Sequence, residues 1–289
     1  MWQRTFQYNI TESDAYNNIH ELLKAHGYSS TVIRHLKETE NGIQKNGVWA
    51  RVYEPLASGD TVTILLTEEA SSENIVPTPL PLDIIYEDDD FVCINKPAGL
   101  LSISNDKERE RTAYHLVREY VKSIDKHNMI FILHRLDKDT SGVLVFCKKQ
   151  KLRDELQEHW NDIVYKRGYY AVCEGVFDDP SGHIENHIAY NKFNMGYVSE
   201  KGSLCITDYK VIKQYNDSAL LDVDIKTGRK NQIRVTFKDI GHPIVGDKNY
   251  GGRKAKRLYL HAYELAFRYK NKDYVFKSDM PSLFRQKEL

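Results

Sequence analysis

Cysteine is scarce in this chain, and paired cysteine motifs are absent. The four cysteines, Cys93, Cys147, Cys173 and Cys205, lie far apart, and none belongs to a Cys-x-x-Cys pair. Three of them stand in apolar, strand-like runs, where a free cysteine usually packs as a small hydrophobic side chain. The pattern predicts neither a disulfide framework nor a zinc knuckle. It also excludes a zinc deaminase, which needs a Pro-Cys-x-x-Cys segment.

Long hydrophobic runs are lacking as well. No apolar segment approaches the roughly 20 residues that a transmembrane helix needs. The first eight residues have no long apolar core and no small-residue cleavage site, so they do not read as a signal peptide. Hydrophobic residues make up 41% of the chain and charged residues 28%, as in an ordinary globular protein. We therefore expect a cytoplasmic protein with no membrane partner.

The net charge is zero, but the charges are unevenly distributed. Residues 1–90 contain 6 Lys and Arg against 15 Asp and Glu, a net charge of −9, which leaves +9 on residues 91–289. Within the second part, residues 226–257 contain 10 basic and 2 acidic residues, a net charge of +8. Such a block can form a phosphate-binding face even on a neutral chain. A solvated surface loop explains the charge equally well.

Residues 1–75 are expected to form a small separate domain. Ile19, Leu22 and Leu23 share one face of a predicted helix, a second helix fits residues 30–36, and short strands are expected near 46–50 and 61–66. This order resembles an S4-type RNA-binding domain, here in a form with few basic residues. A proline-containing linker at 76–83 would follow, and residues 84–289 would form a larger domain.

Apolar runs and helical spacing outline the larger domain. The expected strands are 91–95, 143–147, 169–173, 219–225 and 232–237, and the expected helices are 112–123 and 151–160.

The segment from His134 to Gly142 is polar and densely charged, yet it lies between two strongly apolar runs, 129–133 and 143–147. Buried strands on both sides would hold this loop at a defined, partly desolvated position. A carboxylate there, beside arginine, histidine and lysine, is a candidate for chemistry. The plainer alternative is a turn in which an aspartate accepts a hydrogen bond from a backbone amide.

Four segments, in the same order, resemble motifs of the RluA/RluD family of RNA pseudouridine synthases. They are Asn-Lys-Pro-Ala-Gly-Leu-Leu-Ser at 95–102, His-Arg-Leu-Asp-Lys-Asp-Thr-Ser-Gly at 134–142, Arg-Gly-Tyr-Tyr-Ala at 167–171, and Thr-Gly-Arg-Lys-Asn-Gln-Ile-Arg at 227–234. The likeness covers about residues 84–267, and it continues through 241–251 and 260–262.

The resemblance implies an isomerase that detaches uracil from ribose at N1 and rejoins it through C5, without a metal or a cofactor. By the resemblance Asp137 is the catalytic carboxylate, Tyr169 the active-site tyrosine, and Arg234 the arginine that pairs with the aspartate. A guanidinium can keep a partly buried carboxylate ionised. A tyrosine ring can stack on uracil. Tyr170, the next residue of the predicted strand, should point to the opposite face.

The resemblance also suggests substrate contacts. Arg135 is placed to help displace or replace the target base, which must leave its stack before it reacts. The other expected contacts are a loop histidine, an isoleucine beneath the base, and basic side chains for the RNA: His134, Ile233, Arg229, Lys96, Arg253, Lys254, Lys256 and Arg257. The chain departs from the family at Asn231 and Thr236, where histidines are usual, and this concerns the local hydrogen bonding.

Two other functions would use the same residues differently. A non-catalytic RNA-binding or ribosome-assembly factor could share the scaffold, but binding alone needs no trio of Asp137, Tyr169 and Arg234. A glycoside hydrolase would pair Asp137 with Asp139, but carboxylates two positions apart in a strand point apart.

We therefore predict a monomeric α+β protein with an S4-like domain and a pseudouridine synthase-like catalytic domain built on a mixed, largely antiparallel sheet. It should isomerise uridines in structured RNA, with ribosomal RNA favoured and transfer RNA as the other candidate.

Overall fold

The computed structural model describes residues 3–12, 14, 16–26, 28, 30–67, 82–104 and 112–285. The chain separates into two compact units, residues 1–77 and 78–289, and each is described here by itself. Residues 76–81 of the predicted linker lie outside the described residues.

In its described residues, the first unit is a small antiparallel sheet with two helices. Its sheet has the order β1-β4-β2-β3. The elements are β1 (Gln3–Asn9), α1 (Ile19–Ala25), α2 (Ser30–Glu38), β2 (Ile43–Lys45), β3 (Val48–Trp49) and β4 (Thr61–Thr67). The Asn18 side chain accepts a hydrogen bond from the Glu21 amide and so caps α1. The apolar face of α1 is buried, which confirms the helix that its spacing predicts. The sequence did not predict strand β1.

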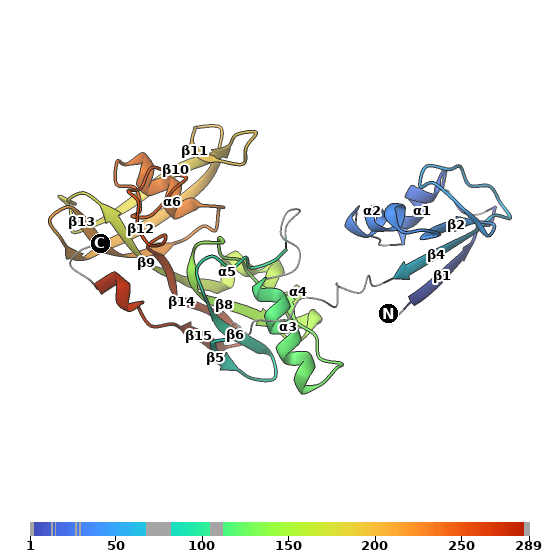
Figure 1. Ribbon diagram of the computed structural model, residues 1–289, viewed down its shortest axis with the longest axis horizontal. Helices are drawn as coiled ribbons and strands as arrows, with labels where there is room; N and C mark the ends of the chain where they lie inside the picture. Colours follow the sequence, from blue (N-terminus) through green and yellow to red (C-terminus); the bar gives the residue numbers. More distant parts are fainter. Residues whose placement is uncertain are drawn as a thin grey trace. The chain divides into compact units, whose positions relative to one another are not determined.

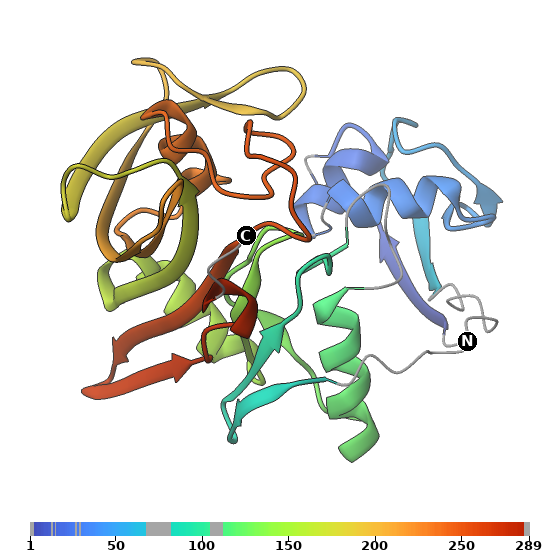
Figure 2. The ribbon, with the colours of Figure 1, turned by 60° about the vertical axis from the view of Figure 1, so that its left-hand side comes forward.

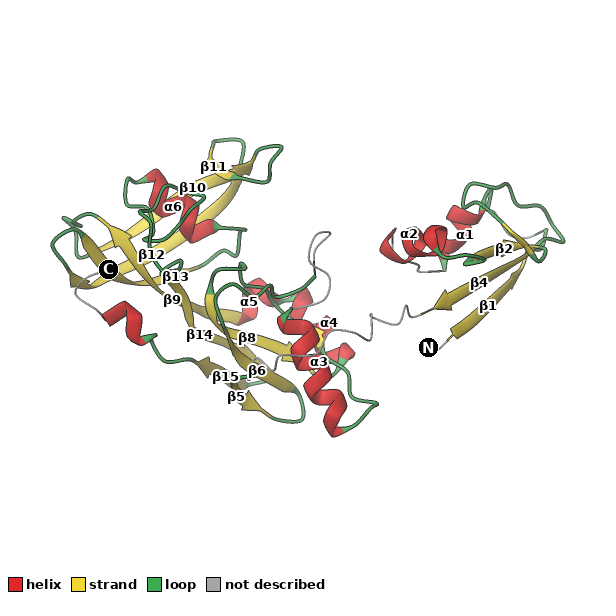
Figure 3. Ribbon diagram, in the orientation of Figure 1, coloured by secondary structure: helices red, strands yellow, loops and turns green. Residues whose placement is uncertain are grey.

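The second unit is built on a large sheet of the order β11-β10-β12-β13-β9-β14-β8-β6-β5, with β15 beside β14 and β7 beside β8 (Figure 3). Strands β8 and β14 pair in parallel, and the other neighbouring strands pair antiparallel. The mixed, largely antiparallel sheet is therefore confirmed. The strands are β5 (Ile84–Glu87), β6 (Phe91–Lys96), β7 (Phe131–Ile132), β8 (Ser141–Cys147), β9 (Val164–Glu174), β10 (Ser181–Tyr190), β11 (Gly196–Val198), β12 (Ser203–Gln214), β13 (Ser218–Ile225), β14 (Leu260–Tyr269) and β15 (Lys272–Lys277).

Helices cover both faces of the sheet near β6 and β8 (Figures 1 and 2). On one face, α3 (Ala113–Ile124) packs Val117 and Val121 against apolar residues of β6 and β8. On the other, α4 (Gln150–Glu158) and α5 (Trp160–Ile163) pack against the same strands and β14. Every residue of β8 is buried, as expected for a strand covered on both faces. The remaining helices are α6 (Gln232–Asp239) and the 3₁₀ helix η1 (Ser282–Arg285).

Gly142 fixes the start of β8 at the centre of the sheet. Its φ is +115°, and a Cβ there would lie 2.0 Å from the Ala262 carbonyl oxygen of β14. A side chain is therefore excluded by the neighbouring strand as well as by the backbone conformation. The end of the charged loop 134–142 is thus held at the β8–β14 junction, where Ala262 pairs with Gly142.

The prediction of a strand at 232–237 is wrong, because these residues form α6. Their alternation of apolar and polar residues and their β-branched side chains are typical of a strand. In the structure Ile233 and Phe237, four residues apart, enter one core, whereas Val235 enters a second core beneath β10 and β11. Packing on two sides of a short helix therefore produces an alternation that resembles strand periodicity.

The four cysteines are buried in the strands β6, β8, β9 and β12. Within the described ranges, no helix is both long enough and apolar enough to cross a membrane.

Candidate active site

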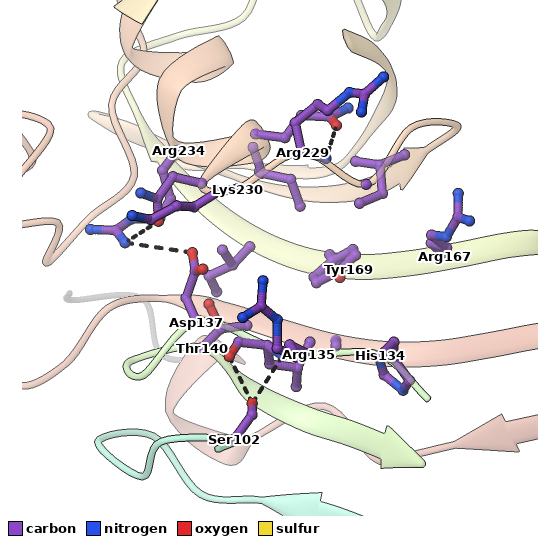
Figure 4. Close-up of a pocket in the computed structure, with 18 of the residues that line it drawn as sticks. Ser102, His134, Arg135, Asp137, Thr140, Arg167, Tyr169, Arg229, Lys230 and Arg234 are labelled. Carbon is purple, nitrogen blue, oxygen red and sulfur yellow. Dashed lines mark hydrogen bonds and ion pairs between the residues drawn. The ribbon is translucent and has the colours of Figure 1, made fainter. Parts of the chain in front are cut away.

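A cleft of about 1120 Å³ opens on the second unit. Its walls come from the loop 133–140, strand β9, the segment 225–231 and the start of α6, so residues far apart in the sequence converge there (Figure 4). The cleft contains the predicted trio of Asp137, Tyr169 and Arg234.

The backbone beside Asp137 is clamped by Ser102. The Ser102 hydroxyl donates to the Leu136 carbonyl oxygen at 2.7 Å and accepts from the Leu136 amide at 3.0 Å. Ser102 is buried, so both hydrogen bonds are shielded from water. The residue that precedes Asp137 therefore has little freedom to move.

Lys96 holds the other side of the same loop. Its Nζ donates to the carbonyl oxygens of Leu100 at 2.7 Å, Pro97 at 3.0 Å and Lys138 at 3.0 Å. Three acceptors match the three N–H groups of an ammonium. Burial lowers the pKa of Lys96 to about 7, although Asp137 and Asp139 oppose that shift. The prediction that Lys96 contacts the substrate is wrong, because Lys96 is fully buried and its ammonium supports the loop.

Asp137 and Arg234 face each other across the cleft. The distance from Asp137 Oδ2 to Arg234 Nη1 is 3.6 Å (Figure 4). The Asp137 side chain is 29% exposed and the Arg234 side chain only 8%, so the carboxylate opens into the cleft while the guanidinium is held behind it.

A second carboxylate holds Arg234 in place. Arg234 Nε and Nη2 donate to the two oxygens of Asp247 at 2.7 and 2.8 Å, in a bidentate ion pair. Asp247 is buried and also accepts from the amides of Asn249 and Tyr250. The remaining nitrogen, Nη1, donates to Asn231 Oδ1 at 2.9 Å and is the one that faces Asp137.

Sequence reasoning missed the contribution of Asp247 to the site. From the sequence, the segment 241–251 is predicted to form turns, with Asp247 as one of the turn residues. The separation of 13 residues between Arg234 and Asp247 gives no periodic signal that would pair them.

Burial raises the pKa of Asp137 above its usual value, and the charges of Arg234, Lys230 and Lys96 oppose that rise. The arginine therefore limits the effect of desolvation without cancelling it. Two nitrogens of Arg234 donate to Asp247, so the guanidinium is shared between two carboxylates.

Tyr169 and Tyr170 point to opposite faces of β9. Tyr169 lines the cleft, whereas the ring of Tyr170 stacks on that of Tyr263 at 4.2 Å between centroids. Burial and the neighbouring Asp137 raise the pKa of Tyr169, so its phenol stays protonated at neutral pH. The site therefore presents a neutral aromatic ring beside an aspartate.

The sequence profile described as RNA pseudouridylate synthase matches residues 90–239. The ribosomal large subunit pseudouridine synthase D of Borreliella burgdorferi is 32% identical over 257 residues, which cover 83% of this chain and 79% of that protein. The chain belongs to the RNA pseudouridylate synthase family. It is therefore an isomerase that converts uridine in RNA to pseudouridine, as the sequence motifs predict.

Two further similarities agree with this family. The ribosomal large subunit pseudouridine synthase D of Neisseria meningitidis is 33% identical over 225 residues, which cover 71% of this chain and 59% of that protein. The solved structure of human RNA Pseudouridylate Synthase Domain Containing 4 has a TM-score of 0.60 at 22% identity, and the match covers 70% of this chain and 90% of that one. The second unit thus has a pseudouridine synthase fold.

Of the other residues predicted to contact the substrate, three line the cleft, and His134 lines it as well but is held by neighbouring residues. Arg135, Arg229 and Ile233 line the cleft, and Arg135 projects from the loop 134–142 into it (Figure 4). His134 lines the cleft too, but its Nε2 accepts from the Val145 amide at 3.1 Å, and its ring stacks on Trp160. Burial and Arg167 lower the pKa of His134 to about 3, so the ring is neutral and serves to pack the loop.

The basic cluster of Arg253, Lys254, Lys256 and Arg257 lies outside the lining of the cleft. Arg253 pairs with Asp217. The Arg257 guanidinium donates to Ser141 Oγ at 2.7 Å and to the Leu260 carbonyl oxygen at 3.2 Å. The Arg257 guanidinium thus braces the β8–β14 junction, and because the residue is only half-buried, RNA contact by it remains a prediction. Lys254 and Lys256 are exposed, and RNA contact by them remains a prediction.

The two departures from the family's histidines have local explanations. Asn231 has a φ of +55°, a left-handed conformation that asparagine adopts more readily than most residues, and its Nδ2 donates to the Tyr250 hydroxyl at 3.1 Å. Thr236 is fully buried and accepts from Asn186 Nδ2 at 3.2 Å. Within the part of the chain that the structure describes, no group of three or more His, Cys, Asp and Glu is placed to hold a metal ion.

Proposed function

We propose that this enzyme isomerises uridines in ribosomal RNA and that Asp137 is its catalytic carboxylate. The observation that carries the assignment is the placement of Asp137: it is the carboxylate on the cleft wall that faces the buried arginine, at 3.6 Å. The ribosomal substrate is supported by the names of the similar proteins from Borreliella burgdorferi and Neisseria meningitidis.

Asp137 would act in its ionised form. The reaction breaks the bond between uracil N1 and ribose C1′ and forms a bond from C5 to C1′, with loss of the C5 hydrogen. The carboxylate can attack C1′, attack the pyrimidine ring or support an elimination, and each route needs a charged Asp137 beside the nucleotide. Arg234, held by Asp247, would orient this carboxylate and favour its charged form.

Tyr169 and Arg135 would position the base. The neutral ring of Tyr169 lines the cleft that holds Asp137, where it can stack on uracil. Arg135 is exposed on the same loop as Asp137 and can fill the space that the extruded base leaves. Ile233 lines the cleft at the start of α6 and can pack beneath the base.

The remaining proposals concern the whole protein. We infer that it works as a monomer in the cytoplasm, where ribosomal RNA is found, without a metal or a cofactor. The order of helices and strands in residues 1–77 supports an S4-like domain.

Tritium release tests the proposal directly, because the C5 hydrogen is lost on isomerisation. RNA labelled at uridine C5 would be prepared as separate ribosomal and transfer RNA pools from cells that lack the modification. Wild type should release tritium from ribosomal RNA, and Asp137→Asn should release it from either pool at least about 100-fold more slowly. Release by wild type from transfer RNA alone would reject the ribosomal substrate, and release by Asp137→Asn at a rate near that of wild type would reject the catalytic role.

A further inference from the structure

An exposed aromatic ring stands at the lip of the catalytic cleft. Phe193 lies in the turn between β10 and β11. These two strands and α6 lie at the same end of the unit (Figure 1). It lines the same cleft as Asp137, yet it is 74% exposed, the highest value among the large hydrophobic side chains that the structure describes as exposed. A ring this open contributes little to the core of the unit.

The backbone around Phe193 is nevertheless well defined. Asn191 Oδ1 accepts from the amides of Phe193 at 2.9 Å and Met195 at 3.1 Å. The Asn191 amide donates to the Met195 carbonyl oxygen at 3.0 Å, which closes the turn. Asparagine side chains commonly stabilise turns in this way. The ring is therefore presented from a turn that has its own hydrogen bonds.

The same turn is tied to the residues that hold Arg234. The Tyr190 hydroxyl donates to the Lys230 carbonyl oxygen at 2.8 Å, and the Gly196 amide donates to the Tyr250 hydroxyl at 3.0 Å. The Arg234 guanidinium lies over the Tyr250 ring, 4.9 Å from its centroid. The turn that carries Phe193 and the arginine that faces Asp137 therefore share Tyr250 as a neighbour.

The charge around the ring indicates what kind of molecule would cover it. Lys192 Nζ lies 5.0 Å from the centroid of the Phe193 ring. Lys230 and Arg229 add positive charge on the same lip of the cleft. An aromatic ring among cations suits a nucleic acid, because bases stack on the ring and phosphates pair with the cations. An apolar protein segment would leave these charges without counterparts.

We propose that Phe193 is a stacking platform for an unpaired base of the RNA, next to the target uridine. This inference rests on the proposed placement of that uridine at Asp137. Stacking at the lip would select a uridine that is flanked by at least one unpaired nucleotide, because a base within a duplex has both of its faces covered. Phe193 would thus help to determine which uridines reach the aspartate.

Substitutions at Phe193 test the proposal. Phe193→Ala removes the ring, Phe193→Leu keeps an apolar side chain without a ring, and Phe193→Trp keeps a ring. Tyr165→Ala is the matched control, because Tyr165 is an exposed aromatic of the same unit that does not line the cleft. The kcat and KM for tritium release would be measured on labelled total RNA from cells that lack the enzyme. RNA dissociation constants would be measured for the same changes combined with Asp137→Asn, and thermal melts would check folding.

For Phe193→Ala and Phe193→Leu, we expect KM and Kd to rise about tenfold, within the range measured for loss of one stacked base. We expect kcat at saturating RNA to change less than about twofold, since the ring lies away from the reacting atoms. Phe193→Trp and Tyr165→Ala should resemble wild type. A Phe193→Ala protein with unchanged KM and Kd would overturn the proposal, and so would a Phe193→Leu protein that behaves like wild type.

The two proposals fail in different ways. Absence of tritium release by wild type from ribosomal RNA would count against the proposed substrate. The Kd series on total RNA would still decide the role of Phe193. A fall in melting temperature without a change in Kd would place the ring in an internal contact and reject the stacking platform.

Discussion

At the scale of single residues, the burial of Asp137 opposes the ionised form that the proposed reaction needs. Burial raises its pKa in the folded protein above 3.8, the usual value for an aspartate. The folded protein therefore holds this proton more tightly than the unfolded chain does. The ionised carboxylate lowers stability at neutral pH, and that penalty disappears as the pH falls through the raised pKa.

For Asp137→Asn we thus expect loss of turnover by at least about 100-fold, with a melting temperature at pH 7 equal to or above that of wild type. Tritium release and thermal unfolding would measure the two effects. Asp139→Asn is the matched control, because Asp139 is an exposed carboxylate on the same loop, and this variant should keep its activity. A clear drop in the melting temperature of Asp137→Asn would contradict the stated sign.

Arg234 should set the pH at which the enzyme becomes inactive in acid. Its charge lowers the pKa of Asp137 against the effect of burial. In Arg234→Gln this attraction is lost, and the acid limb of kcat/KM should move up by about one pH unit, together with a fall in kcat. Arg229→Gln serves as the comparison, because Arg229 lines the cleft without contacting Asp137, and it should change KM alone. An acid limb that stays in place in Arg234→Gln would refute this account.

At the scale of elements, the site depends on the turn that follows α6. Asp247 receives two hydrogen bonds from Arg234 and two from the amides of residues 249 and 250. In Asp247→Asn the buried arginine loses its counter-charge, which costs about 3 kcal/mol in stability. Turnover should fall about tenfold or more, since Arg234 is no longer oriented toward Asp137.

Chemical denaturation and single-turnover tritium release would measure both effects of Asp247→Asn. Asp217→Asn gives the control, because Asp217 pairs with Arg253 at an exposed position, where an ion pair contributes little. Equal losses of stability in the two variants would be incompatible with the buried pair as the stronger contact.

The elements also show how far the sequence can lead. The loop 134–142 is predictable because it interrupts two apolar strands, and that contrast is local. Helix α6 is not predictable, because the apolar residues Ile233, Val235 and Phe237 alternate with polar ones as in a strand. In the structure they fill two different cores. The role of Asp247 is also hidden, since its pairing with Arg234 arises only when the turn folds back on the helix. Lysine is a residue type that often contacts RNA, and only the burial of Lys96 in the structure reveals that it holds the loop instead.

At the scale of the whole molecule, the charge asymmetry has a measurable consequence. Residues 1–77 contain 6 Lys and Arg against 10 Asp and Glu, a net charge of −4. The cations on the cleft all belong to the second unit. The two units have separate cores, since one apolar cluster contains residues of the first unit alone and the others contain residues of the second. A protein of residues 78–289 is therefore expected to fold.

Deletion of residues 1–77 should leave the salt dependence of RNA binding unchanged within about one unit of the log–log slope, because that slope counts the phosphates neutralised by cations. The control is Lys230→Gln in the full chain, which should lower the slope by about one if Lys230 contacts a phosphate. A slope that falls by several units on deletion would show that the acidic unit contacts the RNA backbone through its few basic residues. An unchanged slope with weaker binding would instead assign the first unit to uncharged contacts, such as those of the exposed Trp49 and Tyr53.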